Sequence, residues 1–149
     1  MDRPHYNFSF NTLNEYTDFE FYSIGNKGTI KKIIRFIKID LEDFYSLSLF
    51  DVFSDGTLSV MSESKNGDMK IVLATVAKTI EKFLELYPTK KVFFSGSTHE
   101  RTRLYRIAIT QEIENIKNLF DILGITEDGL EIFAPNRPYQ GFIISLKAQ

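Results

Sequence analysis

The chain contains no cysteine among its 149 residues. Disulfide frameworks and thiolate metal sites are therefore excluded, and the cytoplasm is the expected compartment. Tryptophan is absent too, and the only histidines are His5 and His99, so a zinc centre built from several histidines is excluded. We expect neither a bound metal nor a cofactor. No segment approaches the apolar length of a membrane span or resembles a signal peptide, so we expect no membrane association.

An excess of charge of one sign is also lacking. The net charge is −2 and the sequence pI is about 5.7. This balance argues against binding of nucleic acid or an anionic membrane by the whole surface, so any contact with a polyanion must be local. There are only four prolines, and no linker rich in proline or glycine divides the chain. We therefore expect a single domain that covers residues 1–149.

Phenylalanine is abundant, with 14 residues, and much of it alternates with polar residues. Alternation around Phe8 and Phe10, and again around Phe19 and Phe21, is typical of half-buried strands. The isoleucines of residues 29–39 also fit a helical stripe, but their density and the turn at residues 25–28 favour a strand. That turn places Lys31 and Lys32 in solvent. Further strands are predicted near the Asp55–Gly56 hairpin signal and at residues 92–94, 130–133 and 142–146.

Two segments have the periodicity of helices. Residues 67–87 carry a stripe formed by Val72, Val76, Ile80 and Phe83. Residues 98–123, which a break near Thr110 would divide, carry a second stripe that ends at Gly124. Its members are Ile113, Ile116, Phe120 and Leu123. The sequence thus predicts an α+β fold, with a mainly antiparallel sheet and two principal helices packed on one face.

The segment that looks built for chemistry follows the strand at residues 92–94. Residues 95–106 read Ser-Gly-Ser-Thr-His-Glu-Arg-Thr-Arg-Leu-Tyr-Arg. The N–H groups and the positive dipole end of a helix N-terminus favour an anion, whereas each arginine there is disfavoured by about 0.3–1 kcal/mol. Something other than helix stability therefore explains the arginines. We expect Ser97 and Thr98 to donate to a phosphate, and Arg101, Arg103 or Arg106 to pair with its oxygens.

The same segment has a purely structural interpretation. Ser97 and Glu100 form a Ser-x-x-Glu capping box, and Gly96 permits a tight turn. At helical spacing, His99, Arg103 and Arg106 lie on one side and Arg101 lies near Tyr105. Leu104, Ile107 and Ala108 lie between them and are expected to face the core. Arginines that flank a core face can extend over it without any ligand. Asn66-Gly67-Asp68 is interpreted as another helix cap, with Asp68 as a general base or metal ligand in the alternative.

The motif Gly-Ser-Thr-x-x-Arg-Thr-Arg-Leu-Tyr-Arg at residues 96–106 resembles the signature of a family of small bacterial proteins known chiefly from Bacteroidetes genomes. The resemblance extends to residues 28–32, to 66–68 with the following 72–76, and to 139–142. It would thus cover most of the chain. We know of no established activity, substrate or cofactor for this family, so the resemblance identifies relatives and not a reaction.

Two classes of function follow from these residues. In the first, the junction binds a phosphate-bearing small molecule or the end of a nucleic acid. An enzymatic version, a metal-independent nuclease, would use His99 and Tyr105 for proton transfer or stacking. In the second, the protein is a non-enzymatic module whose arginines contact acidic groups of a partner, including a second copy in a homo-oligomer. A concave pocket that holds His99 and Tyr105 would favour the first class, and a flat, apolar-rimmed patch the second.

Overall fold

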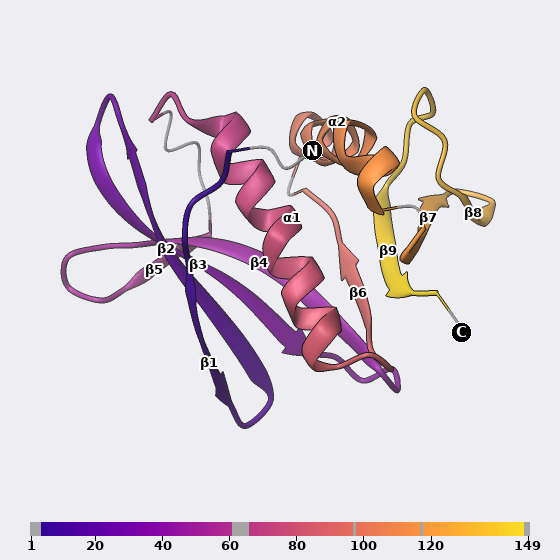
Figure 1. Ribbon diagram of the computed structural model, residues 1–149, viewed down its shortest axis with the longest axis horizontal. Helices are drawn as coiled ribbons and strands as arrows, with labels where there is room; N and C mark the ends of the chain where they lie inside the picture. The colour runs from indigo at the N-terminus through magenta and orange to yellow at the C-terminus, as the bar shows by residue number, and fades with distance from the viewer. Residues whose placement is uncertain (1–3, 61–65, 97, 117, 148–149) are drawn as a thin grey trace.

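A computed structural model describes residues 4–60, 66–96, 98–116 and 118–147, and it has the α+β fold that the sequence predicts (Figure 1). In these residues the strands are β1 (Ser9–Leu13), β2 (Tyr16–Gly25), β3 (Gly28–Lys38), β4 (Phe44–Val52), β5 (Leu58–Val60), β6 (Lys91–Phe94), β7 (Phe120–Thr126), β8 (Gly129–Ile132) and β9 (Gly141–Leu146). The helices are α1 (Met69–Leu86) and α2 (His99–Ile116). None of the helices in the described ranges is long and apolar enough to cross a membrane.

The strands form one sheet in the order β1-β2-β3-β4-β6-β9-β7-β8, with β5 paired to β4. Of the pairings between described strands, only that of β4 with β6 is parallel. Parallel neighbours need a crossover connection, and α1 lies in the one between β4 and β6. The last strand, β9, lies between β6 and β7 and so joins the two halves of the sheet. Both helices lie on the same face (Figure 1).

The β2–β3 hairpin confirms the strand and the turn predicted for residues 25–39. Gly25 pairs with Gly28 across a two-residue connection, and Gly28 has a φ of 91° that favours glycine. Ile33 and Ile34 point to opposite faces, as the period of a strand requires. The prediction that Lys32 is solvated was wrong. Its ammonium group is fully buried and pairs with Asp51 of β4 on the face that bears the helices.

The stripe predicted for α1 is confirmed, because Val72, Val76, Ile80 and Phe83 are all buried. The ring of Phe83 stacks on Phe36 of β3 with the centroids 4.4 Å apart and the planes within 4°. Offset or stacked aromatic pairs add stability beyond the area that they bury. The helix ends at Leu86, before Pro88, which cannot continue it. The contact between Phe83 and Phe36 fixes α1 across the middle of β3 and β4.

The prediction of a helix over residues 98–123 was wrong for residues 118–123. Helix α2 ends at Ile116, and Phe120 begins strand β7. Phe120 and Ile122 point toward the helices, whereas Leu123 points to the other face, so the apolar residues follow the period of a strand. Gly124 is not a helix stop. It lies in β7 under the ring of Tyr139, where a Cβ would come within 2.2 Å of the ring.

The core face predicted for α2 was also wrong. Among its side chains up to residue 111, Thr102 and Ile109 are buried, whereas Leu104, Ile107 and Ala108 are only half-buried and line a hollow beside α1. The start of α2 is held to the loop after β6 by a hydrogen bond between Gly96 and Thr102. This attachment turns the helix so that Thr102 and Ile109 face the sheet.

Candidate functional site

The strand-to-helix junction is held together by Gly96 and Thr102. The Gly96 N–H donates to Thr102 Oγ1 at 3.0 Å, and this hydroxyl lies 3.1 Å from the carbonyl oxygen of Thr98, to which it donates. A Cβ at residue 96 would lie 2.4 Å from the Thr102 nitrogen and 2.5 Å from the Arg101 Cβ. Real Cβ atoms do not approach other atoms so closely, so residue 96 must be glycine for the loop to pack on the first turn of α2.

Thr98 is the N-cap of α2. Its Oγ1 accepts the N–H of Arg101 at 3.2 Å, and its carbonyl accepts the N–H of Thr102 at 3.0 Å. The predicted capping box relied on Ser97, which lies outside the described residues, and on Glu100, which is exposed in the first turn. The cap thus uses the threonine hydroxyl that the sequence assigned to a phosphate. The ligand-binding roles of Ser97 and Thr98 stay predictions.

The three arginines of the junction have three different environments. Arg106 donates from Nη1 to the carbonyl oxygen of Pro135 at 2.9 Å and so ties α2 to the loop after β8. Arg103 is exposed, as is His99 one turn before it. Arg101 is half-buried, with its Cβ against Gly96. The guanidinium group of Arg106 therefore has a structural partner. The assignment of the three arginines to a phosphate stays a prediction.

Tyr105 and His99, the candidate catalytic residues, do not share a depression. Tyr105 packs edge-on against Phe94 of β6 with the centroids 5.4 Å apart, and it lines a hollow between α1 and α2 that does not include His99. Burial raises the pKa of Tyr105, although the nearby Arg101 opposes this effect. Catalysis by proton transfer needs both groups within reach of one substrate. The catalytic roles of His99 and Tyr105 stay predictions.

A buried polar network at the start of α1 was not foreseen. Asp68 is the N-cap residue, but its carboxylate does not cap the helix; it accepts the hydroxyl protons of Tyr6, at 2.6 Å, and Ser23. Asn66 donates to Ser23 Oγ at 3.0 Å and to the carbonyl of Gly28 at 3.0 Å. Ser23 and Asn66 are almost completely buried. The network attaches the start of α1 to the β2–β3 hairpin, and among the described residues no cluster of histidines and carboxylates could hold a metal ion.

Because of this network, we expect the free energy of unfolding to vary with pH in the alkaline range. Burial raises the pKa of Tyr6 above its usual value of about 10, and the hydrogen bond to Asp68 is the second cause of this shift. The folded state thus holds the phenolic proton more tightly than the unfolded state, so this stabilisation is present below about pH 10 and is lost as pH rises through the folded pKa. We expect Tyr6→Phe to lower the free energy of unfolding at neutral pH by about 1–3 kcal/mol and to weaken its alkaline decline.

Urea titrations at neutral pH and above pH 10 measure both effects. Tyr22→Phe is the matched control, because Tyr22 is exposed on the same strand as Ser23. An alkaline decline that is equally steep in wild type and Tyr6→Phe would contradict the prediction.

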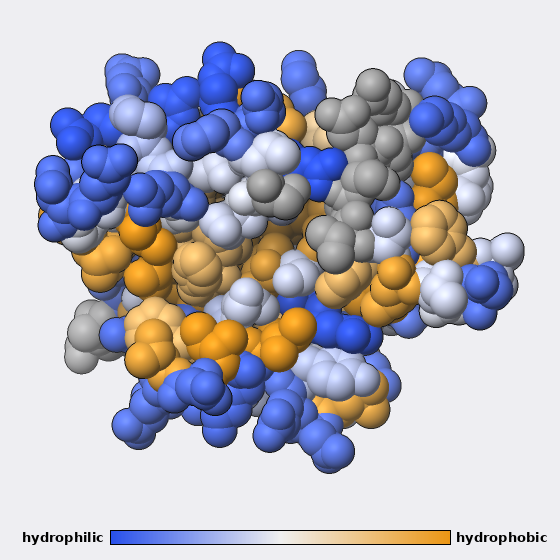
Figure 2. Space-filling view, turned by 180° about the vertical axis from the view of Figure 1, so that it is seen from behind, coloured by the Kyte–Doolittle hydropathy of each residue, from blue (hydrophilic) through white to orange (hydrophobic). Residues whose placement is uncertain are grey.

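The face of the sheet opposite the helices is apolar, and no described helix covers it (Figure 2). The strand register places one set of apolar side chains on this face, with charged residues between them. We call the surface that these residues form the open face. Its apolar residues include Tyr16, Ile37, Phe44, Phe50, Val52, Phe93, Leu123 and Ile143, which are half-buried, and Ile33, which is buried. Figure 2 shows apolar side chains gathered around a hollow in the middle of this view, with hydrophilic side chains around its margins.

An arginine is held rigidly within the open face. Arg35 of β3 forms a bidentate pair with Asp18 of β2, with Nε–Oδ1 at 2.7 Å and Nη2–Oδ2 at 2.9 Å. Its guanidinium carbon lies 4.3 Å from the ring centroid of Tyr16 and 5.6 Å from that of Phe50. The bond to Asp18 raises the pKa of Arg35, and both interactions hold the side chain flat against the sheet.

The other charges of the open face also balance. Lys31 pairs with Glu20 at 3.6 Å, and Lys91 lies 5.5 Å from the ring centroid of Phe44. Asp121 is in the same row of the sheet as Lys91, two strands away. The described strands thus present three cations and three anions on this face. A signal for it was in the sequence, because strands β3 and β4 carry apolar residues at both odd and even positions, which indicates burial on both faces.

Comparison with known proteins gives a family and no activity. The model of a family described as "Family of unknown function (DUF6934)" matches residues 2–147. No curated protein and no solved structure matches the chain.

Proposed function

Since the chain belongs to the family of unknown function DUF6934, we propose a function from its own geometry: it is a non-enzymatic module that binds a second copy of itself through the open face. The observation that carries this proposal is the row of aromatic and aliphatic side chains, Phe44, Phe50 and Phe93 among them, on a sheet face that neither described helix covers. In folded proteins, a contiguous exposed apolar patch of this kind marks an interaction site.

The size of the open face suits a dimer. Six neighbouring strands contribute to it, namely β2, β3, β4, β6, β9 and β7. At about 4.8 Å between strands they span roughly 25 Å. Five or six residues of each strand at about 3.3 Å span roughly 17–20 Å, which gives about 400–500 Å² in projection. Side-chain relief increases the area that two such faces can bury. The result is of the same order as the roughly 800 Å² that each partner buries in a standard interface.

The charges of the open face favour a second copy over a nucleic acid. A polyanion requires a net positive surface, whereas the three cations here are matched by Asp18, Glu20 and Asp121. A neutral apolar face is complementary to itself. Two copies related by a two-fold axis would stack sheet on sheet about 10 Å apart, with Arg35 and its aromatic neighbours near the centre. Arginine and aromatic residues are common at the energetic centre of interfaces.

Sedimentation velocity over a range of protein concentrations tests the proposal. We expect wild type to be a dimer and Phe50→Glu to be a monomer, since a charge in the middle of an apolar interface costs about 2 kcal/mol or more, or roughly 30-fold in the dissociation constant. Leu86→Glu is the matched control, because Leu86 is an exposed leucine at the end of α1 on the other face. It should dimerise as wild type does.

Circular dichroism checks that each variant is folded, and Phe93→Glu provides a second test of the same face. A wild-type protein that is monomeric at every concentration would overturn the proposal. A dimer of unchanged strength in both phenylalanine variants would also overturn it, because association would then use another surface.

A further inference from the structure

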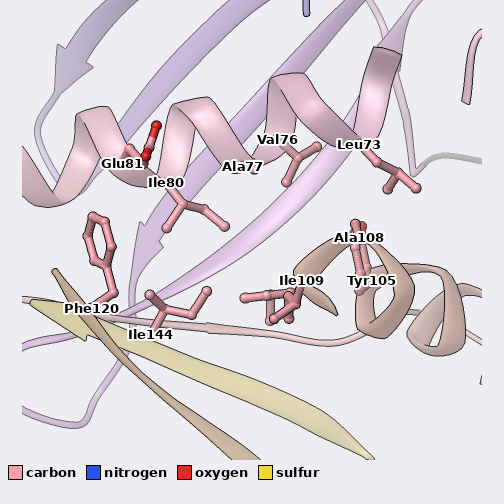
Figure 3. A pocket seen from close by; sticks show the side chains of 11 residues that line it. Leu73, Val76, Ala77, Ile80, Glu81, Tyr105, Ala108, Ile109, Phe120 and Ile144 are labelled. Atoms are coloured by element: carbon pink, nitrogen blue, oxygen red, sulfur yellow. The ribbon is translucent and has the colours of Figure 1, made fainter. Parts of the chain in front are cut away.

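An apolar groove runs between α1 and α2 on the face of the sheet opposite the open face. It consists of two adjoining hollows that share Leu73 of α1 and Ala108 of α2 in their walls. The inner hollow has a volume of about 40 Å³ and the outer one about 260 Å³. Figure 3 shows the inner hollow, with side chains of α1 on one side and Tyr105, Ala108 and Ile109 of α2 on the other.

The groove exists because small side chains meet at the seam of the two helices. Ala77 of α1 and Ala108 of α2 leave space above a floor formed by Phe94, Phe120 and Ile144 of the sheet. The walls and floor of the inner hollow are almost entirely carbon. Water gains few hydrogen bonds in such a space, and apolar cavities of this kind take up apolar molecules instead.

The two ends of the groove differ in charge. Glu81 lines the inner end, but Lys78 neutralises it at 3.1 Å. Lys70 lines the outer end, is exposed, and forms no ion pair with a described residue. Within the described residues, the groove is thus an apolar channel with one cation at its mouth, Lys70, that forms no ion pair. Ile80 lies ten positions after Lys70, which corresponds to about 15 Å along α1.

We propose that this groove binds a free medium-chain fatty acid, or a monocarboxylate of the same amphipathic shape. The alkyl chain lies in the outer hollow between Leu73 and Ala108, which has the larger volume, and the carboxylate pairs with Lys70. The apolar lining and the cation at one end complement the two parts of such a molecule. The proposal is independent of self-association, because the groove and the open face lie on opposite sides of the sheet.

Isothermal titration with decanoate and with the uncharged 1-decanol tests it. We expect wild type to bind both, decanoate more tightly. Lys70→Gln should weaken decanoate at least fivefold and leave decanol unchanged, and Lys82→Gln is the matched control because Lys82 is on the same helix outside the groove. Ala108→Phe fills the groove and should weaken both ligands at least tenfold. Leu104→Glu, at the rim, provides a second blocking variant should Ala108→Phe fail to fold.

The outcomes separate the two parts of the proposal. Failure of wild type to bind either probe overturns it, as does binding that the blocking variants leave unchanged, which would indicate adsorption elsewhere. Equal effects of Lys70→Gln and Lys82→Gln on decanoate would overturn the role of Lys70. The monomeric variant Phe50→Glu should bind decanoate as wild type does, so failure of the dimer proposal leaves this measurement unaffected.

Discussion

Truncation of Phe83 to alanine is expected to lower the free energy of unfolding by about 3–5 kcal/mol. Phe83 is completely buried, stacks on Phe36 at 4.4 Å and contacts the rings of Tyr45 and Tyr87, each with centroids 5.1 Å away. It thus joins α1 to β3 and β4. Its loss removes apolar burial and leaves a cavity that the rigid sheet below cannot close. The whole stability of a domain of this size is about 5–15 kcal/mol, so the effect is large.

Chemical denaturation followed by far-ultraviolet circular dichroism measures the change. The matched control is Phe53→Ala, because Phe53 is 55% exposed in the β4–β5 connection. An exposed side chain away from special contacts should contribute no more than about 0.5 kcal/mol. Comparable losses in the two variants would show that α1 does not rest on the sheet through Phe83.

Gly96→Ala is expected to be the most damaging small substitution at the junction. The added Cβ would lie 2.4 Å from the backbone nitrogen of Thr102, so the loop and the first turn of α2 must separate. Overpacking of this kind costs about 1–3 kcal/mol, and backbone atoms cannot rotate away as a side chain can. The bonds between Gly96, Thr102 and Thr98 would lengthen or break. We therefore expect a cost at the upper end of that range.

Scanning calorimetry gives the loss of stability, and hydrogen exchange at the Arg101 and Thr102 amides locates it. Gly28→Ala is the contrasting variant, since residue 28 has open space around it but a φ of 91°, which costs an alanine about 1–2 kcal/mol. It should leave exchange at α2 unchanged. Wild-type stability and exchange in Gly96→Ala would contradict the close packing described for the junction.

The elements that were predicted correctly are those whose surroundings are uniform along their length. Helix α1 packs one stripe on the sheet from Val72 to Phe83, so its periodicity is visible in the sequence. Strand β3 was recognised from its isoleucines and from the turn before it. In both elements local preference and tertiary packing agree, and a pattern of apolar residues is then sufficient.

Strand β7 was mistaken for helix because its apolar residues fit both periods. Phe120 and Leu123 are three residues apart and would share a helical face, yet they point to opposite faces of the sheet. Pairing with β8 on one side and β9 on the other decides the matter. The β9 partner lies beyond the β7–β8 hairpin in the chain, so a window that covers β7 alone does not contain the information.

The candidate site was located but its contacts were not predicted. The sequence singled out the junction from its glycine, hydroxyls and arginines. The closure of Thr102 on Gly96, and the bond of Arg106 to Pro135, depend on how α2 lies on the sheet. The network of Tyr6 with Asp68 joins residues 62 positions apart. Hydrogen bonds over such separations cannot be inferred from residue types alone.

By itself, the sequence determined the α+β class, the main helix and the absence of disulfide chemistry, because composition and local periodicity are sufficient for these. Only the tertiary structure decided which of the two apolar faces of β3 and β4 is covered. Both faces carry aliphatic and aromatic residues in the sequence, but the helices can lie on one face only, and the crossover connections place them together. The other face, with Phe50 and Arg35 near its middle, is not covered by either of the two described helices.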